Sequence, residues 1–172
     1  MKRYLVAALG LSLSVSQVGC GQLTVGPGRG AVPSTTPGDP VRTKFLVNVD
    51  AQGTALLGHD PVAFFTDKKP VMGTAELRTV YKGAVYQFAS AEHKAMFDKD
   101  PSKYEPQFGG YCGYAASIKK VSPISVEFFE IIDGRLVLQH NKKAWDLWHK
   151  DVPGNLTKAD ANWPVLVENR GI

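Results

Sequence analysis

The chain has 172 residues, of which 44% are hydrophobic and 21% charged, and its formal net charge is +4. This length allows one domain with appendages, and the composition is that of a globular protein with a hydrophobic core. The lysines fall in short scattered pairs such as Lys119-Lys120. Because a nucleic-acid-binding surface needs clustered basic residues with interleaved aromatics, we expect no nucleic-acid partner.

Residues 1–20 are predicted to be a signal peptide of the lipoprotein type. Lys2 and Arg3 precede an apolar run over residues 4–15, which is too short to span a bilayer permanently. Val18-Gly19-Cys20 resembles a bacterial lipobox, although Gln17 stands where leucine is usual. We therefore expect export, acylation of Cys20 and anchoring at the periplasmic face of a bacterial membrane. Ordinary cleavage nearby, which would leave a soluble periplasmic protein, is the alternative.

A tether and one folded domain are expected to follow. Residues 21–43 are rich in Gly, Pro, Ser and Thr without a hydrophobic period, as in a flexible linker. Residues 44–172 form the predicted domain, and no internal repeat is apparent in them.

Two β-hairpins are predicted in this domain, after a first strand over residues 45–49. One hairpin has strands at residues 77–81 and 85–89 around Lys82-Gly83. The other has strands at residues 128–132 and 136–139 around Asp133-Gly134, a strong two-residue turn signal.

Short helices are expected between and after the hairpins. Ser90 is predicted to cap a helix that ends at Asp100-Pro101, and Asn141 to cap one closed by Pro153-Gly154. Asn155 is predicted to cap a last helix that ends at Trp163-Pro164. The expected fold class is α+β, a small antiparallel sheet of hairpins with short helices packed on it in a single domain.

The stretch from residue 107 to 117 contains three glycines, two tyrosines and Cys112. If Cys20 is acylated or removed, Cys112 has no intrachain partner. A lone thiol in an oxidising compartment is buried, metal-bound or reactive.

Several segments resemble known families. Residues 58–66, 81–93 and 97–104 resemble the YHS domain, and residues 108–112, 151–154 and 159–163 resemble the exported YHS-domain proteins of bacteria. The resemblance extends from about residue 44 to residue 163. It implies cysteine ligands in the segments matching residues 60–63 and 88–93 of metal-binding members. This chain has Ala63, Ala89 and His93 there, so that thiolate set is missing.

A metal site in this chain would need other ligands, and the candidates are His59, His93 and Cys112, with Asp60 or Met72 as further ones. Imidazole and thiolate together suit copper, zinc or nickel. These residues come from separate segments, so their convergence is an expectation about the tertiary structure. Structural roles are the alternative: His93 packed on the core side of its helix, His59 orienting a turn, and Cys112 as a small buried hydrophobic residue.

The expected function is an exported binding module for a transition metal, acting in trafficking or sensing. A metal-free structural or protein-interaction domain is the alternative. A thiol enzyme using Cys112, with His59 or His93 as its base, comes third. We expect no enzyme and no catalytic residues, because no third orienting residue is evident and so small a domain has little room for a substrate cleft.

Overall fold

The structure is a computed structural model that describes residues 44–172. These residues belong to one compact unit, Val41–Ile172. The predicted signal peptide, Cys20 and the tether lie outside the described residues. Within residues 44–172, no helix is both long and apolar enough to cross a membrane.

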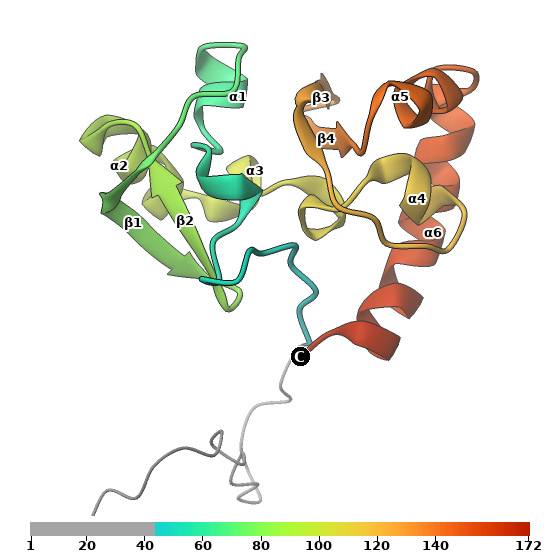
Figure 1. Cartoon of the computed structure of the whole chain (residues 1–172), viewed down its shortest axis with the longest axis horizontal. Coiled ribbons are helices and arrows are strands. Elements are labelled where there is room, and N and C mark those ends of the chain that lie inside the picture. Colours follow the sequence, from blue (N-terminus) through green and yellow to red (C-terminus); the bar gives the residue numbers. More distant parts are fainter. Residues whose placement is uncertain (1–43) are drawn as a thin grey trace, which may run out of the picture. The chain divides into compact units, whose positions relative to one another are not determined.

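Two antiparallel β-hairpins form the framework of the fold, and each is followed by two helices (Figure 1). The first half contains η1 (Leu56–Gly58), α1 (Ala63–Thr66), β1 (Thr74–Tyr81), β2 (Ala84–Phe88), α2 (Ala91–Lys99) and α3 (Pro101–Tyr104). The second half contains η2 (Gln107–Gly110), α4 (Gly113–Ser117), β3 (Ser125–Ile132), β4 (Arg135–Gln139), α5 (Lys142–Trp148) and α6 (Val152–Arg170). The predicted α+β class is confirmed. The described strands form two separate two-stranded sheets rather than one sheet.

The hairpins form where the turn residues predicted them. Lys82 and Gly83 have φ angles of 49° and 77°, and Asp133 and Gly134 have 50° and 76°. Two successive positive φ angles are the geometry of the tight turn that matches the twist of antiparallel strands. Glycine at the second position adopts this conformation without steric cost.

The predicted helix starts at Ser90 and Asn141 are also confirmed. The side chain of Ser90 accepts a hydrogen bond from the backbone N–H of His93, and that of Asn141 accepts one from Ala144. Each cap satisfies a backbone donor that the first helical turn leaves free.

The C-terminal helix differs from the prediction. Pro153 and Gly154 do not close α5 but lie in the first turn of α6, where a missing backbone N–H costs nothing. Asp151 caps this helix, which continues through Pro164 to Arg170. Asn155 is buried inside it and donates to the carbonyl oxygens of Leu147 and Trp148.

The predicted strand at residues 45–49 is not formed, apart from one isolated bridge between Val49 and Ala55. This segment is held by long-range backbone bonds instead. Asn48 N–H donates to the carbonyl of Gly109, and Phe45 and Ile172 exchange two backbone hydrogen bonds. Its backbone groups are therefore satisfied without a sheet partner.

The two halves repeat one another, contrary to the expectation of no internal repeat. Thr74 pairs with Phe88 in the first hairpin and Ser125 pairs with Gln139 in the second, a shift of 51 positions (125 − 74 and 139 − 88). Both hairpins have their register irregularity directly after this pair. The turns, the caps Ser90 and Asn141, and the caps Asp100 and Asp151 keep the same spacing.

The left-handed turn ahead of each hairpin repeats as well. Leu56, Leu57 and Gly58 have φ angles of 54°, 54° and 79°. Phe108, Gly109 and Gly110 have 53°, 55° and 74°, one position further along than the hairpin spacing gives. Agreement in turns, caps and irregularities indicates an internal duplication of one structural unit.

Strand β4 lies between the two hydrophobic cores of the described domain. Its side chains alternate: Leu136 and Leu138 join the core of the first half with Phe88 and Phe97, whereas Val137 joins the second core with Trp148. All six of these residues are completely buried. The two halves therefore share β4 as a common wall.

Candidate functional site

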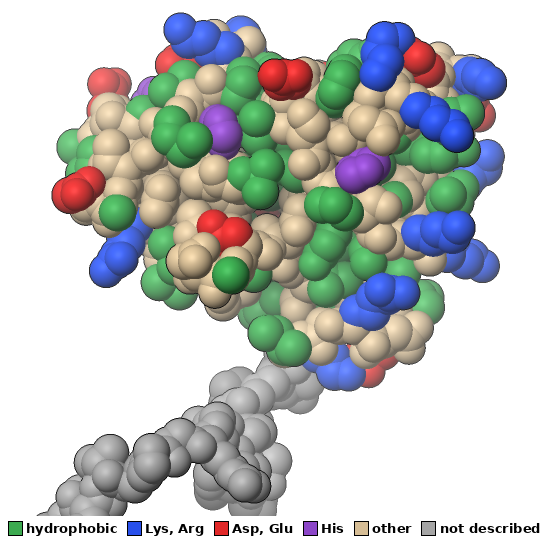
Figure 2. Space-filling view, in the orientation of Figure 1, with side chains coloured by type: hydrophobic (Ala, Val, Ile, Leu, Met, Phe, Trp, Pro, Cys, Tyr) green, Lys and Arg blue, Asp and Glu red, His purple; other side chains and the backbone are tan. Residues whose placement is uncertain are grey.

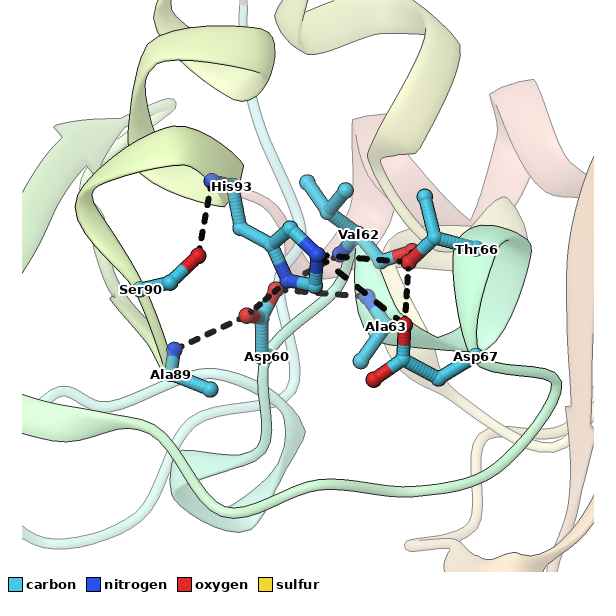
Figure 3. Close-up of polar contacts among 8 residues, drawn as sticks. All are labelled: Asp60, Val62, Ala63, Thr66, Asp67, Ala89, Ser90 and His93. Atoms are coloured by element: carbon cyan, nitrogen blue, oxygen red, sulfur yellow. Dashed lines mark hydrogen bonds and ion pairs between the residues drawn. The ribbon is translucent and has the colours of Figure 1, made fainter.

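Asp60 is a fully buried carboxylate at the start of the first half (Figure 3). Its Oδ1 accepts hydrogen bonds from the backbone N–H groups of Val62 at 2.8 Å and Ala63 at 3.4 Å. Its Oδ2 accepts from the N–H of Ala89 at 2.8 Å and contacts Nδ1 of His93 at 2.7 Å. Four partners compensate the cost of burying this group.

His93 lies on the first turn of α2, where the Ser90 cap holds its backbone N–H. Its side chain is 15% exposed. Because the Asp60 carboxylate is an acceptor, Nδ1 carries the proton between them, and Nε2 is the ring nitrogen left for another partner. A carboxylate behind a histidine is the arrangement that fixes ring orientation and tautomer at metal sites.

Two side chains at the end of α1 lie next to His93 Nε2. Thr66 Oγ1 is 3.3 Å away and Asp67 Oδ1 is 4.0 Å away. Figure 3 shows Thr66 and Asp67 on the side of the imidazole opposite Asp60. The imidazole thus connects a buried carboxylate to one that is 36% exposed.

Asp67 was not among the candidates named from the sequence. Its role depends on where α2 brings His93, which no local pattern reveals. Two metal ligands at about 2.1 Å from one ion in tetrahedral geometry are about 3.4 Å apart. Asp67 Oδ1, which accepts a hydrogen bond from Thr66 Oγ1 at 2.8 Å, is 4.0 Å from His93 Nε2 and thus somewhat beyond that separation.

The contacts of His59 are separate from those of Asp60 and His93. Its Nδ1 contacts the carbonyl oxygen of Leu56 at 3.1 Å, and its backbone forms an antiparallel bridge with Met72. The expectation that His59 orients the turn before Asp60 is in line with the Leu56 contact.

Cys112 is a free thiol in the second half and is 1% exposed. It donates to Oε1 of the buried Gln139 at 3.2 Å. Burial raises the pKa of the Cys112 thiol, and hydrogen-bonding backbone groups of Ala115, His140 and Tyr114 offset part of that rise. A raised pKa is the opposite of what an activated nucleophile needs.

No hydrogen bond or ion pair among residues 44–172 joins any two of His59, His93 and Cys112. Within the same residues, no group of three or more His, Cys, Asp or Glu side chains is arranged to hold a metal ion. The shared ligand set of these three residues stays a prediction.

The positions at which the resemblance implies cysteine ligands do converge. The Ala63 and Ala89 backbones and the His93 side chain all bond to Asp60. The place where the resemblance implied metal ligands is thus a single place in the fold, at Asp60.

The second half lacks this chemistry. Cys112 corresponds to Asp60 by the spacing of the left-handed turns, 52 positions, and Ala144 corresponds to His93 by the hairpin spacing of 51. Ile118 stands where Asp67 stands in the first half. The backbone was kept while the polar side chains were not, so the candidate site belongs to the first half alone.

A pocket of about 340 Å³ lies elsewhere, beside the segment at residues 44–47. It is lined in part by Lys82, Glu105 and Trp163, and none of the predicted ligands lines it.

The described domain is therefore a small α+β module in which a buried carboxylate, Asp60, holds a histidine, His93. Residues 62–107 match the family model of the YHS domain, so the chain contains a YHS domain. The match covers α1 to α3 and includes Asp67 and His93. No curated protein and no solved structure was found to match the chain.

Proposed function

We propose that this protein is an exported binding module that holds a transition metal ion, with His93 Nε2 as its first ligand. Asp60 holds the imidazole from behind, and Asp67 supplies a carboxylate oxygen on the open side. The observation that carries the proposal is the 2.7 Å contact between Asp60 and His93 Nδ1, which turns Nε2 toward Thr66 and Asp67.

The convergence of positions 63, 89 and 93 on Asp60 supports the same location. Metal-binding YHS domains are expected to use cysteines there, and here only the imidazole remains. One imidazole and one carboxylate, with water completing the coordination, suit zinc, copper(II) or nickel. Two protein ligands make an exchangeable site, which fits transfer or sensing of a metal better than permanent structural binding.

The proposal includes export with an anchor at Cys20. Acylation there would hold the domain at the periplasmic face of a membrane. Replacing Cys20 by Ala should then move the protein from the membrane fraction to the soluble periplasmic fraction. Equal partition of both proteins into the membrane would contradict the anchor without bearing on the metal site.

The decisive experiment is calorimetric titration of the full chain with Zn²⁺, Cu²⁺ and Ni²⁺, combined with the metal content of the protein purified without chelator. The test variant is His93→Asn, whose amide nitrogen can still donate to Asp60 in place of Nδ1 but which lacks Nε2. Asp67→Asn removes only the second ligand's charge. Asp98→Asn is the matched control, because Asp98 is a carboxylate of the same half that pairs with Lys94.

We expect binding by the parent and by Asp98→Asn, a weaker affinity in Asp67→Asn, and none in His93→Asn. Binding that survives in His93→Asn would move the site elsewhere. Absence of binding by the folded parent would favour the alternative, a metal-free structural or interaction domain in which His93 only donates a hydrogen bond to Asp60.

A further inference from the structure

His59 and Met72 form a close cross-strand pair. Asp60 N–H donates to the carbonyl of Val71, and Gly73 N–H donates to the carbonyl of Gly58. These bonds flank the bridge between His59 and Met72, which makes the two a non-hydrogen-bonded antiparallel pair. In such a pair the Cα atoms are about 4.5 Å apart and both side chains lie on the same face.

The imidazole of His59 is held in one tautomer. Its Nδ1 is 3.1 Å from the carbonyl oxygen of Leu56. A carbonyl oxygen only accepts, so Nδ1 carries the proton and Nε2 bears the lone pair. This bond orients the ring as backbone carbonyls do at metal-binding histidines.

Met72 is placed unusually for a thioether. Its side chain is 59% exposed, whereas methionine normally fills gaps in cores. A Cβ built on Gly58 would lie 3.4 Å from Met72 Sδ and 3.3 Å from Gln87 Oε1. The Met72 sulfur thus lies close to the backbone of Gly58, the residue before His59.

The backbone ahead of this pair is strained. Leu56 and Leu57 both adopt the left-handed conformation, which is uncommon for residues with a branched side chain, and Leu57 is 50% exposed. Phe108 adopts the same conformation in the second half, so this turn belongs to the repeated fold and fixes where residue 59 lies. Figure 2 shows histidine side chains at the surface beside hydrophobic ones.

We propose that His59 Nε2 and Met72 Sδ form a binding site for a cuprous ion. Thioether sulfur is a soft ligand that selects Cu(I), and imidazole suits copper in either oxidation state. The site shares no ligand with the His93 centre, so either can exist without the other.

The second half provides an internal comparison. The positions that correspond to His59 and Met72 are Tyr111 and Pro123, or Ile124 with the longer spacing, and none of these residues is a soft ligand. His140 of that half contacts the carbonyl of Pro123 through Nδ1, as His59 contacts that of Leu56. The second half contains no methionine, so His140 has no thioether partner there.

The test is competition for Cu(I) between the full chain and a chromogenic chelator under reducing, oxygen-free conditions. Every protein carries Cys20→Ser, so that this thiol does not compete. The variants are Met72→Leu, which keeps side-chain size, and His59→Asn, whose amide can still donate to Leu56. His140→Asn is the matched control. Ag(I) serves as a redox-inert second probe, and His93→Asn reports on the other centre.

We expect one Cu(I) per chain, with affinity about tenfold or more lower in Met72→Leu and in His59→Asn. His140→Asn and His93→Asn should bind Cu(I) as the parent does, and Met72→Leu should leave Zn²⁺ binding unchanged. If Met72→Leu binds Cu(I) and Ag(I) each with the same affinity as the parent, the site is overturned. Loss of Cu(I) only in His93→Asn would assign the copper to the other centre and also overturn it.

Discussion

Cys112 occupies in the second half the place that Asp60 occupies in the first. Asp60 accepts from backbone N–H groups two, three and 29 residues further on, at Val62, Ala63 and Ala89. The Cys112 thiol faces the corresponding backbone groups, at Tyr114, Ala115 and His140. The donors that hold a carboxylate in one half thus surround a thiol in the other.

This correspondence predicts that the second half tolerates a carboxylate at position 112. In Cys112→Asp, the backbone donors would stabilise the charge, and Nε2 of Gln139, which has no partner among residues 44–172, could donate to it. We expect a loss of about 1–2 kcal/mol in unfolding free energy. Ala116→Asp, at a completely buried site of the same core, should lose about 3–5 kcal/mol. Urea unfolding followed by circular dichroism measures both, and equal losses would contradict the correspondence.

Asp60→Asn should destabilise the first half strongly. The amide nitrogen would face a donor, Ala89 N–H or His93 Nδ1–H, in a fully buried position. We expect a loss of about 2–4 kcal/mol in unfolding free energy. Asp98→Asn, whose side chain is 39% exposed, should change stability by less than about 1 kcal/mol. A loss for Asp60→Asn no larger than for this control would mean that the buried carboxylate is not a structural centre.

Cys112 should resist alkylation while the protein is folded. Burial both blocks access and raises the thiol pKa, so little thiolate exists at neutral pH. In a Cys20→Ser chain, iodoacetamide labelling measured by mass should be slow without denaturant and fast in urea. Rapid labelling of the folded protein would instead revive the thiol-enzyme hypothesis.

Gly109→Ala should be far more costly than Gly134→Ala, although both glycines have positive φ angles, 55° and 76°. A Cβ on Gly109 would clash with the carbonyl oxygen of Leu46, whereas nothing lies within 4 Å of one on Gly134. We expect about 1 kcal/mol for Gly134→Ala from the backbone alone. Gly109→Ala should cost about 2–4 kcal/mol, because it also expels residues 45–48 from their place. Similar melting temperatures for the two variants would show that this segment adds no stability.

The ion pair between Lys82 and Glu105 should make alkaline stability depend on Glu105. Burial lowers the pKa of the Lys82 ammonium, but the hydrogen bonds and charge of Glu105 outweigh burial and raise it above its usual 10.5. A raised folded-state pKa means that the contribution is fully present below pH 10.5 and is lost as pH rises through the folded pKa. The stability difference between the parent and Glu105→Gln should therefore be constant from pH 7 to about pH 10 and shrink above it. A difference that grows with pH would reverse this assignment.

Local signals were enough to predict the hairpins and most helix starts. Lys82-Gly83 and Asp133-Gly134 define their turns by themselves, and Ser90 and Asn141 define their caps. Pro153 misled the prediction, because proline is unfavourable inside a helix but acceptable in its first turn. The strand expected at residues 45–49 failed because its partners, Gly109 and Ile172, are distant in sequence.

The site was predictable only in part. The chemistry of imidazole singled out His93, and Asp60 was named as a further candidate ligand. Their contact needs α2 to fold back onto residue 60, and the position of Asp67 follows only from that packing. The duplication was hidden in the sequence because only the turn and cap residues repeat. The buried side chains at corresponding positions differ, as Phe97 and Trp148 do.

The duplication gives spectroscopists an internal reference. Three backbone amides bond to Asp60 at the site, those of Val62, Ala63 and Ala89. The corresponding amides face Cys112, where no counterpart of His93 is present, and belong to Tyr114, Ala115 and His140. In a metal titration followed by nuclear magnetic resonance, shifts that move the first set but not the second report binding at His93. Shifts common to both sets report only pH, salt or nonspecific adsorption, within the same molecule and the same sample.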